Sequence, residues 1–275
     1  MGERVAVTGT EAGFLHIFYQ NHSLMRLLTL CCVATVSFLL CSLQGSGQLF
    51  LGVEGGPNRN YLTTSNASEP FTNYDGMKGW NIGIPVGYQF FDWLALEATP
   101  TYIQKNFDIV RTGFFTGVYQ KNYNKYLQLP LNLRFSFGGK ALRGFVDLGG
   151  YGAYWVSGRI KGTEANILNE VDTAYQTVNP TSILGENSAY NYNQKYVFNS
   201  AKDNRMEFGL IGGAGISYEL SELYTFYLEG RYYRAMTDQQ KHYELNQASR
   251  YNDNYGLTLG CTIQVKKLFS TLFKK

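Results

Sequence analysis

The fold of this 275-residue chain is decided by the stretch Leu127-Gln128-Leu129-Pro130-Leu131-Asn132-Leu133-Arg134-Phe135-Ser136-Phe137. Its odd positions are all large and apolar, whereas its even positions are polar or proline. Successive side chains of a β-strand point to opposite faces, so this alternation predicts a strand with one apolar and one polar face. Two architectures fit such a strand. A soluble sandwich or lipocalin turns the apolar face inward, and a membrane barrel turns it outward to lipid.

The composition favours strands over helices. The chain has 22 Tyr, 18 Phe and 30 Gly, and only 16% of its residues are charged, whereas about a quarter are charged in typical soluble domains. Aromatic residues are favoured in strands, and helices prefer Ala, Leu, Glu and Lys. The formal net charge of +3 is too small to indicate a nucleic-acid partner.

The N-terminal region has the pattern of a secretory signal. Met25-Arg26 precede a largely apolar run, 27–43, and small residues follow up to Gly47. This order predicts a signal peptide at 25–47 that is cleaved after export. We interpret residues 1–24 as a misassigned upstream extension. The alternative is an uncleaved signal anchor, although the apolar run is short for the about 20 residues that a span needs.

The alternation of 127–137 recurs in seven other stretches. They are 49–56, 79–90, 94–102, 146–156, 206–218, 224–232 and 254–265. The sequence therefore predicts an all-β fold of eight antiparallel strands, and about 9–11 tilted residues are enough for a strand to cross a bilayer. Three prolines, Pro85, Pro100 and Pro130, lie inside these strands. Each lacks a backbone donor and is expected at a bulge or an unpaired position.

The connections between the predicted strands alternate in length. Short connections are expected around Phe91-Asp92, at 138–143 and at Ser221-Glu222, and long loops at about 58–78, 104–122, 157–204 and 237–252. Short turns at one end and long loops at the other are typical of an up-and-down transmembrane β-barrel. The loop 157–204 is rich in Asn and Tyr, which suits a binding surface, and a plain solvated loop is the alternative.

The polar faces of the strands indicate which side is inside. They carry seven charges, namely Glu54, Glu97, Arg134, Asp147, Glu207, Glu229 and Arg231. An eight-stranded barrel is only wide enough to be filled by side chains, and buried charges must be paired or solvated. We therefore predict a lumen charge network that plugs the barrel, in which Arg134 pairs with Glu97 or Asp147. The lipid-facing positions are then Ile82, Ile84, Leu129, Leu131, Leu133, Leu210, Leu228, Leu257 and Leu259.

Four segments resemble the PorT-like family of small outer-membrane β-barrel proteins of Bacteroidetes-type bacteria. They are Leu51–Gly56, Gly83–Tyr88, Tyr126–Leu133 and Phe145–Tyr151. The resemblance implies a barrel domain over residues 48–275 in the cell envelope, located in the outer membrane of a Gram-negative bacterium. It also implies an accessory role in protein secretion or surface assembly, and it brings no catalytic residues.

The sequence contains no convincing catalytic motif. His242 lies near Asp238 and Glu244 in the last long loop, and a lone loop histidine is usually a solvated side chain. The glycine-rich run 209–215 resembles a phosphate loop, but no helix pattern follows it, and glycines of a narrow barrel explain it better. Only Cys261 of the four cysteines lies outside the predicted signal, which excludes a disulfide framework. We expect no enzyme, no cofactor and no metal site.

Three functions remain open at this point. The first is a non-enzymatic, monomeric barrel with a structural or surface-interaction role through its long loops. The second is the accessory role in a secretion or surface-assembly machine, and the third is a small channel. The expected partners are outer-membrane lipid and other envelope or secretion proteins.

Overall fold

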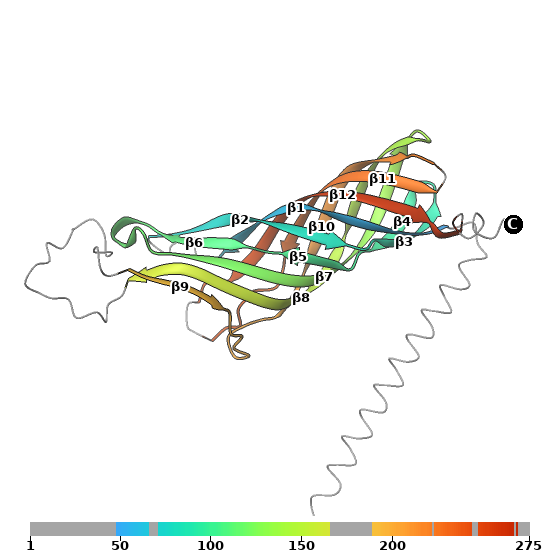
Figure 1. Ribbon diagram of the computed structural model, residues 1–275. Helices are drawn as coiled ribbons and strands as arrows, with labels where there is room; N and C mark the ends of the chain where they lie inside the picture. Colours follow the sequence, from blue (N-terminus) through green and yellow to red (C-terminus); the bar gives the residue numbers. More distant parts are fainter. Residues whose placement is uncertain are drawn as a thin grey trace, which may run out of the picture. The chain divides into compact units, whose positions relative to one another are not determined.

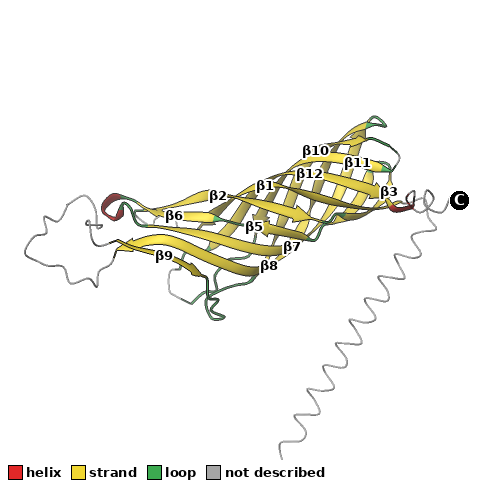
Figure 2. Ribbon diagram, viewed as in Figure 1, coloured by secondary structure: helices red, strands yellow, loops and turns green. Residues whose placement is uncertain are grey.

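The computed structural model describes residues 48–65, 71–165, 189–221, 223–243, 247–266 and 268. The predicted extension 1–24 and signal peptide 25–47 lie outside these residues. The described part of the chain is almost entirely β-strand (Figure 2), and every pair of strands in it is antiparallel. None of the helical residues in these ranges belongs to a helix long and apolar enough to span a membrane.

Twelve strands follow one another along the chain (Figure 1). They are β1 (Gln48–Thr64), β2 (Thr72–Gly83), β3 (Val86–Phe91), β4 (Leu94–Ala98), β5 (Thr101–Gln104), β6 (Phe107–Arg111), β7 (Tyr119–Gly138), β8 (Leu142–Ala165), β9 (Ala189–Lys195), β10 (Met206–Glu219), β11 (Tyr224–Ala235) and β12 (Arg250–Gln264). One turn of 3-10 helix, η1 (Gly113–Phe115), joins β6 to β7.

The strand pairings close into a ring. β1 pairs with β12 on one side and with β2 and β3 on the other. From β12 the order continues through β11, β10, β8 and β7. β7 then pairs with β4, β5 and β6, which return to β3 and β2. Every strand of the ring therefore has hydrogen-bonded neighbours on both sides.

Eight strands were predicted where the described residues form twelve, and prolines account for part of the difference. Pro85 separates β2 from β3, and Pro100 separates β4 from β5, because a proline nitrogen cannot donate to the ladder. The neighbouring backbone groups still bond across these gaps, since Ile84 N donates to Pro100 O at 3.0 Å. Pro130 lies within the continuous strand β7, where its carbonyl accepts from Thr99 N at 3.2 Å.

The long loops were predicted at the wrong length. β1 runs on to Thr64 and β2 begins at Thr72, so most of the predicted loop 58–78 is strand. The predicted loop 104–122 likewise contains β6 and the start of β7, and 157–204 contains the end of β8 and all of β9. Most residues of these extensions are polar, and β6 has apolar residues at the adjacent positions Ile109 and Val110, so the extensions lack the regular apolar alternation from which strands were predicted, although their backbones pair normally.

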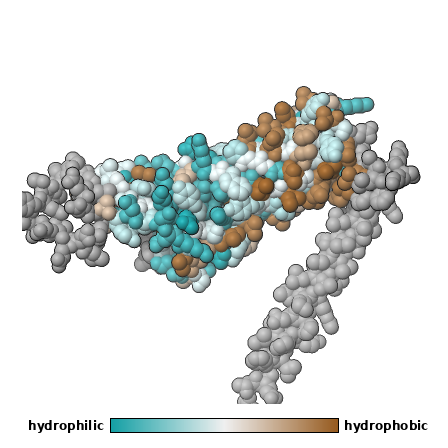
Figure 3. All heavy atoms as spheres, in the orientation of Figure 1, coloured by the Kyte–Doolittle hydropathy of each residue, from teal (hydrophilic) through white to brown (hydrophobic). Residues whose placement is uncertain are grey.

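Side chains alternate between a polar interior and an apolar exterior along the half of the strands near the short turns. On β7 the outward positions Leu127 to Phe137 are exposed, whereas Gln128, Asn132 and Arg134 between them are buried. Figure 3 shows hydrophobic residues gathered over the part of the sheet that contains β11 and β12, and hydrophilic residues toward β6 and β9. We call the exposed apolar side chains of this half of the strands the apolar band. The apolar band covers only part of the length of the strands.

Candidate functional site

Six charged side chains meet inside the ring, and we call them the charge layer. They are Glu54 of β1, Glu97 of β4, Arg134 of β7, Asp147 of β8, and Glu229 and Arg231 of β11. Each occupies an inward position of its strand, and register places Arg134 directly opposite Asp147. Strands far apart in the sequence therefore bring these groups together because they share one ring and one side-chain parity.

Arg134 binds three carboxylates at once. Its Nη2 lies 2.7 Å from Asp147 Oδ2 and 3.2 Å from Glu229 Oε2, and its Nη1 lies 3.1 Å from Glu97 Oε2. The guanidinium also stacks over the ring of Phe145, with Cζ 4.2 Å from the ring centroid. Both pairings predicted for Arg134 are present, and Glu229 is an additional partner.

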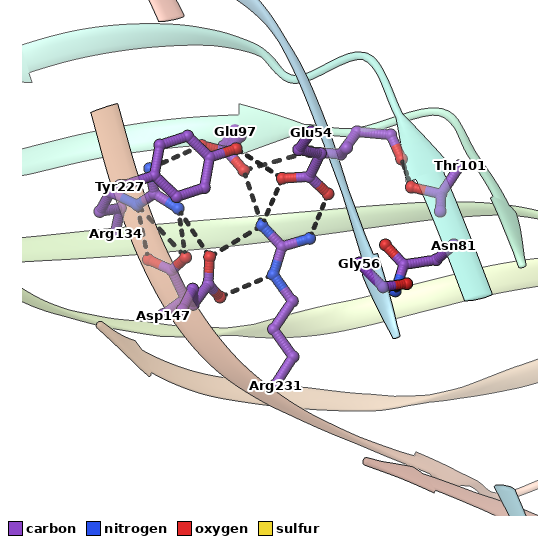
Figure 4. A network of polar contacts seen from close by, with 11 residues as sticks. Glu54, Gly56, Asn81, Glu97, Thr101, Arg134, Asp147, Tyr227 and Arg231 are labelled. Carbon is purple, nitrogen blue, oxygen red and sulfur yellow. Dashed lines mark hydrogen bonds and ion pairs between the residues drawn. The ribbon is translucent and has the colours of Figure 1, made fainter. Parts of the chain in front are cut away.

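Arg231 is the second arginine of the charge layer and binds Glu54 and Glu229 (Figure 4). Its Nη1 pairs with Glu54 Oε1, and its Nη2 donates to Glu54 Oε2 at 2.7 Å and to Glu229 Oε2 at 2.8 Å. The Tyr227 hydroxyl donates to Glu54 Oε2 at 2.5 Å. Glu97 Oε1 lies 3.7 Å from Arg231 Nη2, so Glu97 links the two arginines.

The charge layer is buried and carries more acid than base. Glu97, Asp147 and Glu229 are 0% exposed and Arg231 is 3% exposed. Four carboxylates against two guanidiniums give a formal charge of −2. Taking such groups out of water costs several kcal/mol per ion, and the bidentate arginine contacts offset this cost. The six side chains of the layer are therefore joined in one continuous network of ion pairs.

Glu207 is the predicted charge that the structure keeps apart from the layer. Its Oε1 accepts from Lys105 Nζ at 2.5 Å and from the Tyr151 hydroxyl at 2.9 Å, and its Oε2 accepts from Asn252 Nδ2 at 2.7 Å. The ammonium of Lys105 also lies 4.6 Å from the centroid of the Tyr151 ring. This second group, the Lys105–Glu207 pair, lies among buried aromatic side chains, including Tyr126 and Tyr151.

Lys105 was missed by the sequence analysis, although it is fully buried. The predicted strand ended at Tyr102, whereas β5 ends at Gln104 and Lys105 directly follows it. Glu97, Thr99, Thr101 and Ile103 are all buried, so continuing the same alternation past Thr101 by two steps would have placed Lys105 inside.

The nine predicted lipid-facing residues all point out of the ring. Their side chains are between 42% and 62% exposed, with Leu228 and Leu259 at the two extremes. The remaining members are Ile82, Ile84, Leu129, Leu131, Leu133, Leu210 and Leu257. So many large aliphatic side chains on one surface are unusual for a protein surrounded by water.

A polar cavity of about 390 Å³ leads from the short-turn side to the charge layer. Its lining includes Asp92, Lys140, Arg143 and Glu219 near the turns, and Arg134 of the layer. The cavity therefore ends where the ion pairs begin.

The weaker sequence candidates are not assembled into a site. His242 is exposed. Asp238 Oδ1 accepts backbone N–H groups of Gln240 and Arg250 at 2.9 and 3.0 Å, and Glu244 lies outside the described residues. The glycine run 209–215 lies inside strand β10, so it does not form a phosphate-binding turn. Within the described ranges, no group of three or more His, Cys, Asp or Glu side chains could hold a metal ion.

Comparison with known proteins identifies a family for this chain. Residues 18–240 match the family model described as outer membrane protein beta-barrel domain. No curated protein matches the chain. The chain resembles the crystal structures of Neisserial surface protein A and of OprG from Pseudomonas aeruginosa, with 10% and 14% identity and TM-scores of 0.38 and 0.39. These matches cover 80% and 79% of this chain and 99% and 97% of those chains.

A third similar structure is Ail, the attachment invasion locus protein of Yersinia pestis. It is 11% identical, the match covers 78% of this chain and 99% of that chain, and the TM-score is 0.36. Identities and TM-scores this low describe a general likeness of architecture, so the family assignment rests on the match of residues 18–240.

Proposed function

Because this chain belongs to the family of outer membrane protein beta-barrel domains, we propose that its ring is an eight-stranded transmembrane barrel in the outer membrane of a Gram-negative bacterium. In this proposal β2 and β3 occupy one position of the ring, and β4, β5 and β6 occupy another. The barrel is non-enzymatic and its lumen is plugged. The strand extensions and loops of the far end form a surface outside the cell.

The observation that carries this proposal is the inverted distribution of side chains. Glu97, Asp147 and Glu229 are buried inside the ring, while Leu129, Leu131 and comparable residues cover its outside. In water this arrangement would expose the aliphatic groups and bury the charges, and both terms are unfavourable. In a bilayer, the same exterior meets hydrocarbon of its own polarity.

A plugged lumen is supported by the charge layer and by the Lys105–Glu207 pair beyond it. Arg134 and Arg231 each contact at least two carboxylates from other strands, and for Arg231 these are Glu54 and Glu97. An ion would have to displace these contacts to pass. The role that follows is structural, or one of surface interaction, and a small channel is the alternative that conductance measurements test.

A partner protein is the second candidate, and strand β9 favours it. β9 pairs with β8, and its second edge has no strand partner in the described part of the chain. Such an edge offers unpaired backbone groups for addition of a strand from another protein. This geometry suits an accessory part of a secretion or surface-assembly machine, as the PorT-like resemblance implies.

Heat modifiability tests the barrel itself. Membrane extracts are loaded for electrophoresis in detergent with and without prior heating, and the protein is detected by antibody. We expect a folded form that migrates differently and disappears on heating. A single unchanged band in both lanes would contradict the barrel. Deletion of the gene tests the second candidate separately, because normal export of surface proteins in the deletion strain would exclude the secretion role.

A further inference from the structure

An apolar groove of about 720 Å³ crosses the outer wall of the ring, at the end of the apolar band away from the short turns. Its walls include Tyr102 of β5, Leu127 and Leu129 of β7, Tyr154 of β8 and Met206 of β10. Register places Tyr102 beside Leu127, Leu127 beside Tyr154, and Tyr154 beside Met206. The groove therefore runs across four neighbouring strands rather than along one.

The groove exists because one outward position of its floor has no side chain. Gly152 lies opposite Leu129, whose side chain points outward. A Cβ added at Gly152 would meet the ring of Phe208 at 3.4 Å and no closer atom outside its own chain neighbours. Close backbone contact therefore does not require a glycine at position 152. The missing side chain of Gly152 leaves the floor of the groove without a protruding group.

Basic side chains follow the groove on the side away from the short turns. Lys125 is the next outward residue of β7 beyond Leu127, and it pairs in register with Ser157 of β8. Arg205 lies on the other side of β8, because its carbonyl accepts from Trp155 N at 2.8 Å. Arg159 is exposed one step further along β8. We call Lys125, Arg159 and Arg205 the basic rim.

Contacts with a backbone carbonyl and with two aromatic rings hold the Arg205 side chain in place. Its Nε donates to Trp155 O at 3.0 Å, and its Cζ lies 4.5 Å from the centroid of the Tyr154 ring. A second ring, Phe198, lies 4.1 Å from the same carbon. No carboxylate of the described residues lies within ion-pairing distance of any member of the basic rim. The rim therefore carries positive charge without a protein counter-ion among these residues.

We propose that the groove and the basic rim together bind one phosphorylated, acylated lipid of the outer leaflet. An acyl chain lies in the groove over Gly152, and the phosphate lies between Lys125 and Arg205. The sequence of side chains along the wall matches such a lipid, because the apolar groove ends at Tyr102 and Tyr154 and the cations of the basic rim lie beyond them. Aromatic rings favour the headgroup level, and a guanidinium binds phosphate through paired hydrogen bonds.

This inference rests on the proposed function, because the far end of the wall faces the outer leaflet only if the ring is an outer-membrane barrel. An acidic peptide fits the observations less well, since the groove is part of the apolar band and leaves no polar partner for a peptide backbone. A free phosphate would meet the rim and leave the groove without a role.

The test measures lipid retained on the folded protein by native mass spectrometry from detergent micelles. Diphosphorylated lipid A is the probe, with dephosphorylated lipid A and inorganic phosphate as comparison ligands. We expect the wild-type protein to retain one diphosphorylated lipid and to retain the dephosphorylated lipid at least about tenfold more weakly, since a charge-assisted contact is worth about one factor of ten or more. Equal retention of both lipids would overturn the proposal. Displacement of the lipid by millimolar inorganic phosphate would indicate a phosphate site instead.

Three variants locate the site. Lys125→Gln with Arg205→Gln is expected to weaken retention about tenfold or more, and Gly152→Leu should weaken it by filling the groove without changing charge. Arg59→Gln is the matched control, because Arg59 is an exposed outward arginine on β1, whose neighbours are β2 and β12. An equal loss in the control would mean general attraction to charge and would contradict a defined site.

Heat modifiability separates the two levels of the proposal. A wild-type protein with no heat-modifiable form would contradict the barrel. A heat-modifiable wild-type protein that does not prefer the phosphorylated lipid would contradict only the lipid site. Because the comparison of lipids uses the wild-type chain, it stands even if a variant does not fold.

Discussion

Loss of the Arg231 side chain should strongly destabilise the ring. Arg231 is 3% exposed and forms ion pairs with Glu54 and Glu229, so Arg231→Gln leaves two carboxylates buried with less compensation. Removal of one partner from a buried ion pair costs about 3–5 kcal/mol. We expect a decrease of that size in the free energy of unfolding, measured by urea titration of the protein folded into vesicles.

A second arginine of the same strand is the control for this measurement. Arg234 has a largely exposed side chain, and its Nη1 lies 4.0 Å from Asp253 Oδ1. Exposed pairs contribute about 0–1 kcal/mol, so Arg234→Gln should change the stability little. An equal effect of both substitutions would mean that burial in the charge layer is not what makes Arg231 important.

The Lys105–Glu207 pair should show strong coupling. Lys105→Met leaves the buried carboxylate of Glu207 with only Tyr151 and Asn252 as donors. We expect a loss of about 3–5 kcal/mol for this single substitution, and the addition of Glu207→Gln should recover part of it. The measurement is a double-mutant cycle by urea titration, with an expected coupling of about 1–3 kcal/mol. Strictly additive losses would show that the two charges are energetically independent.

At the residue scale, side-chain parity predicted the partners of Arg134 correctly, and the same parity explains the omission of Lys105. Glu97, Asp147 and Arg134 were assigned to the interior because each lies on the polar face of its strand, between outward apolar residues. Lys105 was not assigned because the strand was expected to end at Tyr102. The separation of Glu207 from the charge layer depends on how far each strand is shifted along its neighbour, and alternation alone does not contain that shift.

At the element scale, the direction of β7 can be tested with one substitution. Leu131 lies near the middle of the outward row from Leu127 to Phe137, so Leu131→Arg places a charge near the bilayer midplane. We expect a cost of about 2–4 kcal/mol in a folding titration into vesicles.

The matched control for Leu131 lies on the same face of β7. Tyr123 is an outward residue beyond Lys125, outside the apolar band, and Tyr123→Arg should cost about 0–1 kcal/mol. A near-zero cost at Leu131 would mean that this face of the strand does not meet the hydrocarbon.

The extended hairpins make a further prediction about backbone protection. β7 from Tyr119 to Asn122 pairs with β6 on one side and β8 on the other. Amides of a strand that is paired on both sides exchange slowly, whereas those of the η1 tip at Gly113–Phe115 should exchange at loop rates. Hydrogen exchange of the folded protein measures this difference. If the amides of 119–122 exchanged as fast as those of the tip, this segment would be a solvated loop, as the sequence suggested, and not a paired strand.

The extensions also show why loops were harder to predict than the strands of the apolar band. In the band, apolar side chains outside and polar side chains inside impose a period of two, and this period is visible in the sequence. Beyond it the inward face also carries polar side chains that bond one another, as Gln120 Nε2 does by donating to Asn122 Oδ1. Strand pairing there depends on hydrogen bonds to neighbouring strands, which leave no hydrophobic period in a single sequence.

At the scale of the whole molecule, the ring follows from the number and direction of the strands. Alternation in eight stretches and short connections at one end were sufficient to predict an all-β antiparallel fold with charges inside. The division at Pro85 and Pro100 was partly visible, because both residues stood out as missing donors. The existence of β9 was not visible, because the alternation in Ala189–Lys195 is limited to Tyr190 and Tyr192 between polar residues, and within the described residues β9 pairs only with the extension of β8.

The proposed closure of the lumen is a property of the whole molecule that conductance measurements test. The polar cavity from the short-turn side ends at the charge layer, so wild-type protein should show little sustained conductance in planar bilayers. Arg231→Ser removes the guanidinium that contacts three carboxylates and changes the formal charge of the layer from −2 to −3. We therefore expect openings that favour cations in this variant and none in Arg234→Ser, with folding verified by heat modifiability. Sustained large conductance of the wild type would contradict the plug and favour a channel. A folded Arg231→Ser variant that stays closed would place the closure at the Lys105–Glu207 pair and its aromatic neighbours instead.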